Sequence, residues 1–94
     1  MGTLEYIQWN DDKDKLLQQI RGLSFLNIAE RILRSDFVDV IDHPNQERYP
    51  GQRMMVIQID NYAYLVPFVE QEGQLFLKTI IPSRKATRTY RKKE

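Results

Sequence analysis

Apolar residues in the first third of the chain follow a short alternation and then a helical spacing. Residues 4–9 (Leu-Glu-Tyr-Ile-Gln-Trp) predict a short strand. Asn10, Asp11 and Asp12 offer side-chain oxygens to the free N–H groups of a helix start, and Arg21 and Gly22 end that helix. Ser24 caps a second predicted helix. The side chains expected to face the core are Leu16, Leu17 and Ile20, then Phe25, Ile28, Ala29, Ile32 and Leu33.

From Phe37 onward the period changes to two, which is typical of strands. The sequence predicts strands over residues 37–41, 53–60, 62–69 and 74–81. Only Asp60 and Asn61 lie near the junction of the second and third of these strands, so we expect a tight hairpin there. Pro67 cannot donate to a ladder of backbone hydrogen bonds, so its position predicts a sheet edge or a bulge.

The end of the chain combines an apolar strand with a basic helix. Residues 75–81 lead into Pro82, and a helix is predicted over residues 83–93. Arg84, Arg88 and Arg91 fall at positions i, i+4 and i+7, with Lys85 and Lys92 on a neighbouring line and Ala86 and Tyr90 facing the sheet. The elements together predict one α+β domain over residues 1–94, in the order β-α-α-β-β-β-β-α. Its helices would pack on one face of a mostly antiparallel sheet, in two layers.

Charge is unevenly distributed along the chain. Residues 78–94 hold seven of the 14 Lys and Arg residues and one of the 13 Asp and Glu residues, so this segment carries +6. Residues 1–77 carry −5, and the formal net charge of +1 hides this dipole. Such asymmetry indicates an end that binds a polyanion or an acidic partner. A solvated basic tail that keeps the protein soluble is the alternative.

The composition excludes several kinds of functional site. The chain has no cysteine, which excludes disulfides and thiolate catalysis, and its one histidine, His43, excludes a multi-histidine metal site. We expect neither a metal nor another cofactor. Asp11, Asp12 and Asp14 are explained by the first turn of a helix, where acids are favoured. No apolar run approaches the roughly 18 residues of a membrane span, and the first residues do not begin a signal peptide, so a soluble cytoplasmic protein is expected.

Four segments together carry a resemblance to a known family. They are residues 7–13 (Ile-Gln-Trp-Asn-Asp-Asp-Lys), 20–25 (Ile-Arg-Gly-Leu-Ser-Phe), 47–49 (Glu-Arg-Tyr) and 80–87 (Ile-Ile-Pro-Ser-Arg-Lys-Ala-Thr). These segments resemble the BrnT family of toxins, which belong to type II toxin–antitoxin pairs. Their order and spacing follow the family along nearly the whole chain. Arg21 stands where the family has a histidine, and Ile20 where it has a lysine.

The resemblance implies a RelE-like fold and a metal-independent endoribonuclease that acts on cellular RNA. It also implies a cognate antitoxin that binds DNA and inhibits the toxin, so that operator DNA is contacted only through the antitoxin. In such cleavage the RNA 2′-hydroxyl attacks the adjacent phosphate, while guanidinium groups neutralise the charge that develops on it. The candidate catalytic residues are Arg21, Arg48, Lys78, Arg84 and Lys85. The candidate RNA-binding residues are Tyr49, Arg53, Arg88 and Arg91.

Each candidate also has a simpler explanation. Lys78 shares a predicted strand face with Phe76 and Ile80 and can snorkel at a sheet edge. Arg48 and Arg53 can pair with Asp42 or Glu47, and Arg21 suits a helix C-terminus whatever its function. Two other functions therefore stay open: a non-catalytic module that binds RNA or protein, and an adaptor whose acidic and basic ends engage different partners.

Overall fold

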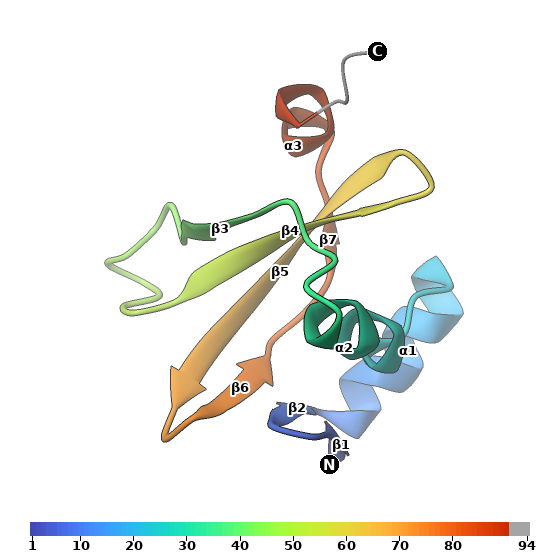
Figure 1. The fold of residues 1–94 in the computed structure, drawn as a ribbon, viewed down its shortest axis with the longest axis vertical. Helices are drawn as coiled ribbons and strands as arrows, with labels where there is room; N and C mark the ends of the chain where they lie inside the picture. Colours follow the sequence, from blue (N-terminus) through green and yellow to red (C-terminus); the bar gives the residue numbers. More distant parts are fainter. Residues whose placement is uncertain (91–94) are drawn as a thin grey trace.

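Within residues 1–90, which the structure describes, seven strands form one sheet (Figure 1). The structure is a computed structural model. The strands run in the order β1-β2-β6-β5-β4-β3, and β7 lies beside β5. Every neighbouring pair is antiparallel except β2 and β6, which are parallel. The protein is therefore an α+β fold with a mixed, mostly antiparallel sheet.

The element order differs from the predicted one in two places, at residues 2–9 and at residues 74–82. The strands are β1 (Gly2–Leu4), β2 (Ile7–Trp9), β3 (Asp39–Asp42), β4 (Arg53–Ile59), β5 (Tyr62–Gln71), β6 (Gln74–Leu77) and β7 (Ile81–Pro82). The single strand predicted over residues 4–9 was wrong, because Glu5 adopts a φ of +55° and turns the chain between β1 and β2. The strand predicted over residues 74–81 was also wrong as one unit, because it is interrupted between β6 and β7.

The boundaries of the first two helices follow the predicted caps, whereas the helix predicted over residues 83–93 ends earlier, at Thr89. The helices are α1 (Asp11–Arg21), α2 (Phe25–Leu33) and α3 (Arg84–Thr89). The Asn10 side chain accepts a hydrogen bond from the Lys13 N–H, and Gly22 ends α1 with a φ of +67°. The Ser24 hydroxyl likewise accepts from the Asn27 N–H at the start of α2. No helix in residues 1–90 combines the length and the apolar character needed to cross a membrane.

The helices α1 and α2 cover one face of the sheet (Figure 1). Trp9 and Phe25 stack in this core with ring centroids 6.2 Å apart. The buried side chains that join them are Ile7, Leu17, Ile28, Ala29, Ile32, Met55, Ile57, Val66, Phe68, Leu75, Leu77 and Ile80. The prediction for α1 was only partly right: Leu17 is buried, but Leu16 is 48% exposed and Ile20 65% exposed. Leu33, at the end of α2, is also 38% exposed.

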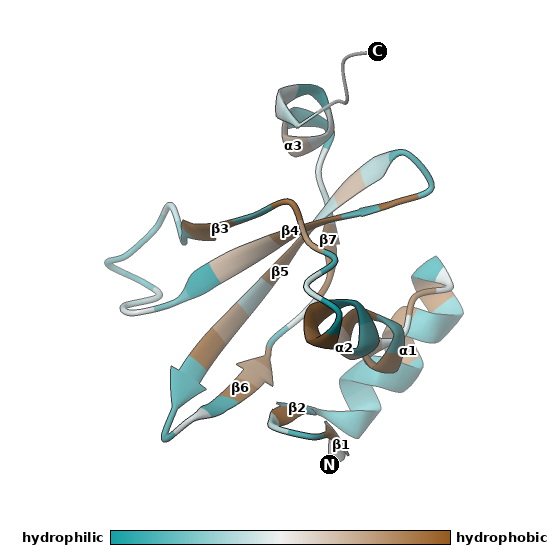
Figure 2. Ribbon diagram, in the orientation of Figure 1, coloured by the Kyte–Doolittle hydropathy of each residue, from teal (hydrophilic) through white to brown (hydrophobic). Residues whose placement is uncertain are grey.

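The third helix packs on the opposite face. Ala86 and Tyr90 contact a smaller apolar cluster of Ile41, Val56, Ala63 and Leu65. Val56 and Leu65 pair across β4 and β5, one residue out of phase with the core pair Met55 and Val66. Since side chains alternate along a strand, the two clusters lie on opposite faces. The prediction that all helices share one face was therefore wrong for α3, although Ala86 and Tyr90 do face the sheet as expected. Figure 2 shows apolar residues in the middle of β4 and β5, between these layers.

Pro67 lies where the neighbour of β5 is interrupted. On one side β5 pairs with β4, with Pro67 opposite Met54. On the other side β6 pairs with β5 from Phe68 onward and β7 pairs with Tyr64 and Leu65, which leaves a gap beside Pro67. The Pro67 carbonyl accepts from the Lys78 N–H in this gap. A residue without an N–H donor is thus tolerated in the interior of the sheet.

Candidate nucleic-acid interface

The segment from Ser83 to Thr87 divides into residues that build α3 and residues that face solvent. The Ser83 hydroxyl caps the helix by accepting from the Ala86 N–H at 3.0 Å. The side chain of Ala86 is buried, and the Thr87 hydroxyl donates to the Ser83 carbonyl. Arg84 and Lys85 are exposed. Three residues of this segment therefore stabilise the helix, and the side chains of the two cations are left exposed to solvent.

Side-chain hydrogen bonds hold α3 against the sheet. The Ala63 N–H donates to the Thr87 hydroxyl at 2.9 Å, and the Gln58 amide donates to the Tyr90 carbonyl at 2.9 Å. The Tyr90 hydroxyl donates to the Asp39 carboxylate at 2.8 Å. This hydrogen bond raises the pKa of Tyr90, and burial and the negative charge of Asp39 act in the same direction. These bonds orient the cations of α3 relative to β4 and β5.

Arg84 and Arg88 line one hollow together with Tyr62 and Thr87, which we call the Tyr62 hollow. Its volume is about 310 Å³. Both arginines are exposed, and they are one helical turn apart on α3. No hydrogen bond or ion pair within residues 1–90 engages either guanidinium. Two guanidinium groups are therefore available beside one aromatic ring.

A second hollow, the Arg21 hollow, adjoins the first. Its volume is about 440 Å³, and residues from the α1–α2 junction, α2 and the β4–β5 hairpin line it. The lining side chains with polar groups are Arg21, Ser24, Asn27, Arg31, Asp60 and Tyr64. The rings of Tyr62 and Tyr64 meet edge to face with centroids 5.6 Å apart, so the linings of the two hollows are in contact through this pair. The two neighbouring hollows are therefore lined by three arginines, Arg21 in one and Arg84 and Arg88 in the other.

Lys85 lies on the other side of α3. It lines a third hollow of about 290 Å³ with Asp42, Met54 and Leu65. Leu65 and Met54 belong to the sheet face on which α3 packs, whereas Tyr62 and Tyr64 belong to the face covered by α1 and α2. The adjacent positions Arg84 and Lys85 thus line different hollows.

Tyr49 and Lys78 line a further hollow with His43, Pro67 and Ile81, which we call the Tyr49 hollow. The rings of Tyr49 and His43 lie 4.4 Å apart, and the Arg48 guanidinium carbon lies 5.6 Å from the Tyr49 ring centre. The Tyr49 ring therefore already has an aromatic and a cationic neighbour from its own loop.

Lys78 has a structural explanation. Its ammonium lies 5.0 Å from the centre of the Phe76 ring. The expected face shared by Lys78, Phe76 and Ile80 was wrong for Ile80, which is buried in the core under α1 and α2. The cause is the interruption between β6 and β7, because a strand must be continuous for its side chains to alternate regularly.

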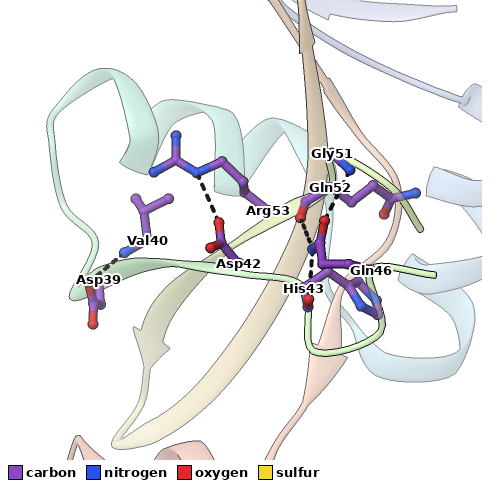
Figure 3. A network of polar contacts seen from close by, with 8 residues as sticks. All are labelled: Asp39, Val40, Asp42, His43, Gln46, Gly51, Gln52 and Arg53. Carbon is purple, nitrogen blue, oxygen red and sulfur yellow. Dashed lines mark hydrogen bonds and ion pairs between the residues drawn. The ribbon is translucent and has the colours of Figure 1, made fainter. Parts of the chain in front are cut away.

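The loop between β3 and β4 is braced by one glutamine (Figure 3). The Gln46 amide donates to the carbonyls of His43 and Gln52, and its oxygen accepts from the Gly51 N–H. Arg53 follows this loop, and its Nε atom lies 4.0 Å from the Asp42 carboxylate. The alternative interpretation of Arg53, that it pairs with Asp42, is therefore the one this geometry favours, at the limit of an ion-pair distance.

The predicted site is brought together only in part. Arg84, Arg88 and Arg21 gather around Tyr62 and Tyr64. The candidates placed elsewhere are Lys85, Lys78, Arg48, Tyr49 and Arg53. Arg91, with Lys92 and Lys93, lies outside the described residues.

Sequence reasoning missed Tyr62, Tyr64 and Asp60 as site residues. Tyr64 packs partly against the core. Both residues stay partly exposed beside the hairpin turn. The available signal was two aromatic residues at i and i+2 directly after a tight turn, since the end of a hairpin is hard to bury completely.

Comparison of the chain with protein-family models, with curated proteins and with solved structures finds no match.

Proposed function

We propose that this protein binds single-stranded RNA along the Tyr62 and Arg21 hollows and cleaves it as a metal-independent endoribonuclease. The single observation that carries the proposal is the Tyr62 hollow, where Arg84 and Arg88 line the same concave surface as an aromatic ring. A guanidinium fork matches two phosphate oxygens, and an aromatic ring stacks on an unpaired base. Together they can bind a phosphate and a base of the same RNA strand.

Cleavage would follow attack by the RNA itself. The 2′-oxygen bonds to phosphorus while the bond from phosphorus to the 5′-oxygen breaks, which gives a 2′,3′-cyclic phosphate and a 5′-hydroxyl. Arg84 and Arg88 would neutralise the charge that builds on the phosphate oxygens. The attacking 2′-hydroxyl loses its proton to solvent water. Of the described side chains that line this hollow, Tyr62 can give a proton, so we assign it the transfer to the leaving 5′-oxygen, after which it takes a proton back from water. His43 lines the Tyr49 hollow instead.

The biological setting that we propose is a cytoplasmic toxin of a type II toxin–antitoxin pair. The resemblance to BrnT toxins supports it, and so does the concentration of positive charge in residues 78–94. A cognate antitoxin with an acidic surface would inhibit the protein by covering this end. Operator DNA would be contacted through the antitoxin.

The test is cleavage of a defined single-stranded RNA by the purified chain in the presence of a metal chelator. We expect fragments ending in 2′,3′-cyclic phosphate, and a loss of about 100-fold in rate for Arg84→Ala combined with Arg88→Ala. The matched control removes two cations from the loop, Arg48→Ala with Arg53→Ala, and should retain most of the rate. Equal losses in the two double variants would contradict the assigned site.

A non-catalytic RNA-binding module is the second candidate. The observation that favours it is the lining of the Tyr62 hollow, which contains no carboxylate and no imidazole among the described residues. Those are the common acid–base groups of ribonucleases that work without a metal. Salt-sensitive RNA binding without any fragments would select this function, and Tyr62→Phe would then leave RNA affinity nearly unchanged.

A further inference from the structure

We propose that the Arg21 hollow is a guanine-binding subsite in which the Asp60 carboxylate accepts hydrogen bonds from the base. The inference rests on the proposed function, because it names the nucleotide that the RNA would place beside the Tyr62 hollow. Three features support it: the size and polarity of the hollow, the Asp60 carboxylate that no described residue pairs with, and the neighbouring Tyr64 ring and Arg21 guanidinium.

The hollow is large enough for a base. Its volume of about 440 Å³ lies within the range of about 300–1,000 Å³ found for small-molecule sites. Its polar side chains come from α1, α2 and the β4–β5 hairpin, three elements that the fold holds together. Tyr64 supplies an aromatic ring to the lining, and it packs against the core, so its position is fixed. A planar ligand can stack on such a ring.

Asp60 is held in place by its backbone and remains unpaired. Asp60 and Asn61 have φ values of +53° and +67°, as required for a tight two-residue hairpin turn. Asp60 is exposed, and within residues 1–90 no hydrogen bond or ion pair involves its carboxylate. The carboxylate is thus presented at a rigid turn with its acceptor capacity free.

The base that fits a free carboxylate best is guanine. Its Watson–Crick edge carries two adjacent donors, N1–H and the N2 amino group, which match the two oxygens of one carboxylate. Adenine and cytosine place an acceptor nitrogen next to their amino group, and uracil places its one N–H between two carbonyls. A carboxylate would be repelled by those acceptors. Unpaired bases in single-stranded RNA are commonly read on this edge.

The cations of the hollow have different roles. The Arg31 guanidinium already donates to Asp36 and to the Gln58 carbonyl, and its Nε donates to Asn27. Arg21 is exposed at the end of α1, and no described contact engages its side chain. Arg21 is therefore the cation that is free to neutralise the phosphate of the bound nucleotide, while Arg31 holds the wall of the hollow.

The experiment compares three fluorescent RNA heptamers by anisotropy at fixed salt. One contains only adenosine, the second carries guanosine at the centre, and the third carries inosine there, which lacks the N2 amino group. We expect the guanosine heptamer to bind about tenfold more tightly than the all-adenosine one, with inosine between them. Asp60→Asn should abolish the guanosine preference, because an amide presents a donor where guanine also presents donors.

The matched control is Glu72→Gln. Glu72 is another exposed acid at a hairpin turn, with a φ of +52°, but it lies between β5 and β6. Asn tolerates a positive φ, so Asp60→Asn keeps the hairpin, which the unfolding curve of the variant would verify.

Each outcome decides a different point. Equal affinity of wild type for all three heptamers would overturn the guanine subsite and leave RNA binding intact. A guanosine preference that survives in Asp60→Asn would overturn the assignment to Asp60. If no heptamer binds, the proposed function fails and the subsite fails with it.

Discussion

Helix α3 and the loop between β3 and β4 both present cations beside the sheet, but they hold them in different ways. On α3 the hydrogen bonds to the sheet come from the backbone, Thr87 and Tyr90, so Arg84 and Arg88 stay free. In the loop the cations are themselves part of the local structure. Arg48 lies over Tyr49, and Arg53 faces Asp42.

The difference shows that the number of cations in a segment does not measure its capacity to bind an anion. A guanidinium that already faces a ring or a carboxylate must give up that contact before it can bind a phosphate. A guanidinium on a helix that is anchored by other residues has no such contact within the protein to break. This contrast predicts which substitutions change RNA binding and which change only stability.

The largest expected effect is on RNA affinity. Replacing Arg84 and Arg88 by Ala together should weaken binding of single-stranded RNA by about 100-fold, since each removes a charge-assisted hydrogen bond. The slope of log affinity against log salt concentration should fall by about 1.4, because about 0.7 is expected for each phosphate contact on a single strand. Fluorescence anisotropy at several KCl concentrations measures both. A similar change in the slope for Arg48→Ala with Arg53→Ala would remove the distinction between the two regions.

The next effect concerns the attachment of α3. Thr87→Val keeps the shape of the side chain but leaves the Ala63 N–H without its acceptor. We expect a loss of about 2 kcal/mol in the free energy of unfolding, measured by urea denaturation. Thr89→Val is the control, because the Thr89 hydroxyl donates to the Lys85 carbonyl at an exposed position and should cost less than about 0.5 kcal/mol. Equal costs would mean that Thr87 does not anchor the helix.

A smaller effect is expected in the loop. Gln46→Ala removes three hydrogen bonds that brace the β3–β4 loop, but water can replace them at this exposed site. We expect a loss of about 1 kcal/mol in the free energy of unfolding and faster hydrogen exchange at the Gly51 amide. The control Gln71→Ala, at the exposed end of β5, should change neither the free energy of unfolding nor the exchange of the Gly51 amide. Unchanged exchange at Gly51 in the Gln46 variant would show that the brace is not needed for loop order.

The smallest effect is a dependence on pH. Because the pKa of Tyr90 is raised in the folded protein, its bond to Asp39 stabilises the fold fully below the ordinary tyrosine pKa of about 10. That contribution is lost as the pH rises through the raised pKa. Wild type should exceed Tyr90→Phe in stability by about 0.5 kcal/mol at pH 8, and the difference should vanish at higher pH. A difference that stays constant across this range would exclude the link to Tyr90 ionisation.

The sequence predicted the limits of α1 and α2 better than the limits of the strands. Asn10, Gly22 and Ser24 set the limits of α1 and α2 through contacts within one or two turns, and Asp60 with Asn61 set the β4–β5 turn in the same way. The break after Leu77 and the reversal at Glu5 were missed. No composition signal marks them, because both depend on which strands become neighbours: β2 pairs with β6, and β7 pairs with β5.

Local sequence by itself determined that Ser83 would start a basic helix, with Ala86 and Tyr90 on its buried side. These features follow from capping and from helical spacing, which act over a few residues. Only the tertiary structure decided that Arg84 and Arg88 would meet Tyr62, and that Lys85 would line a different hollow with Asp42 and Met54. The reason is that a side chain's neighbours across the sheet depend on strand register and on the face where a helix docks, and both are set by the packing of the whole core.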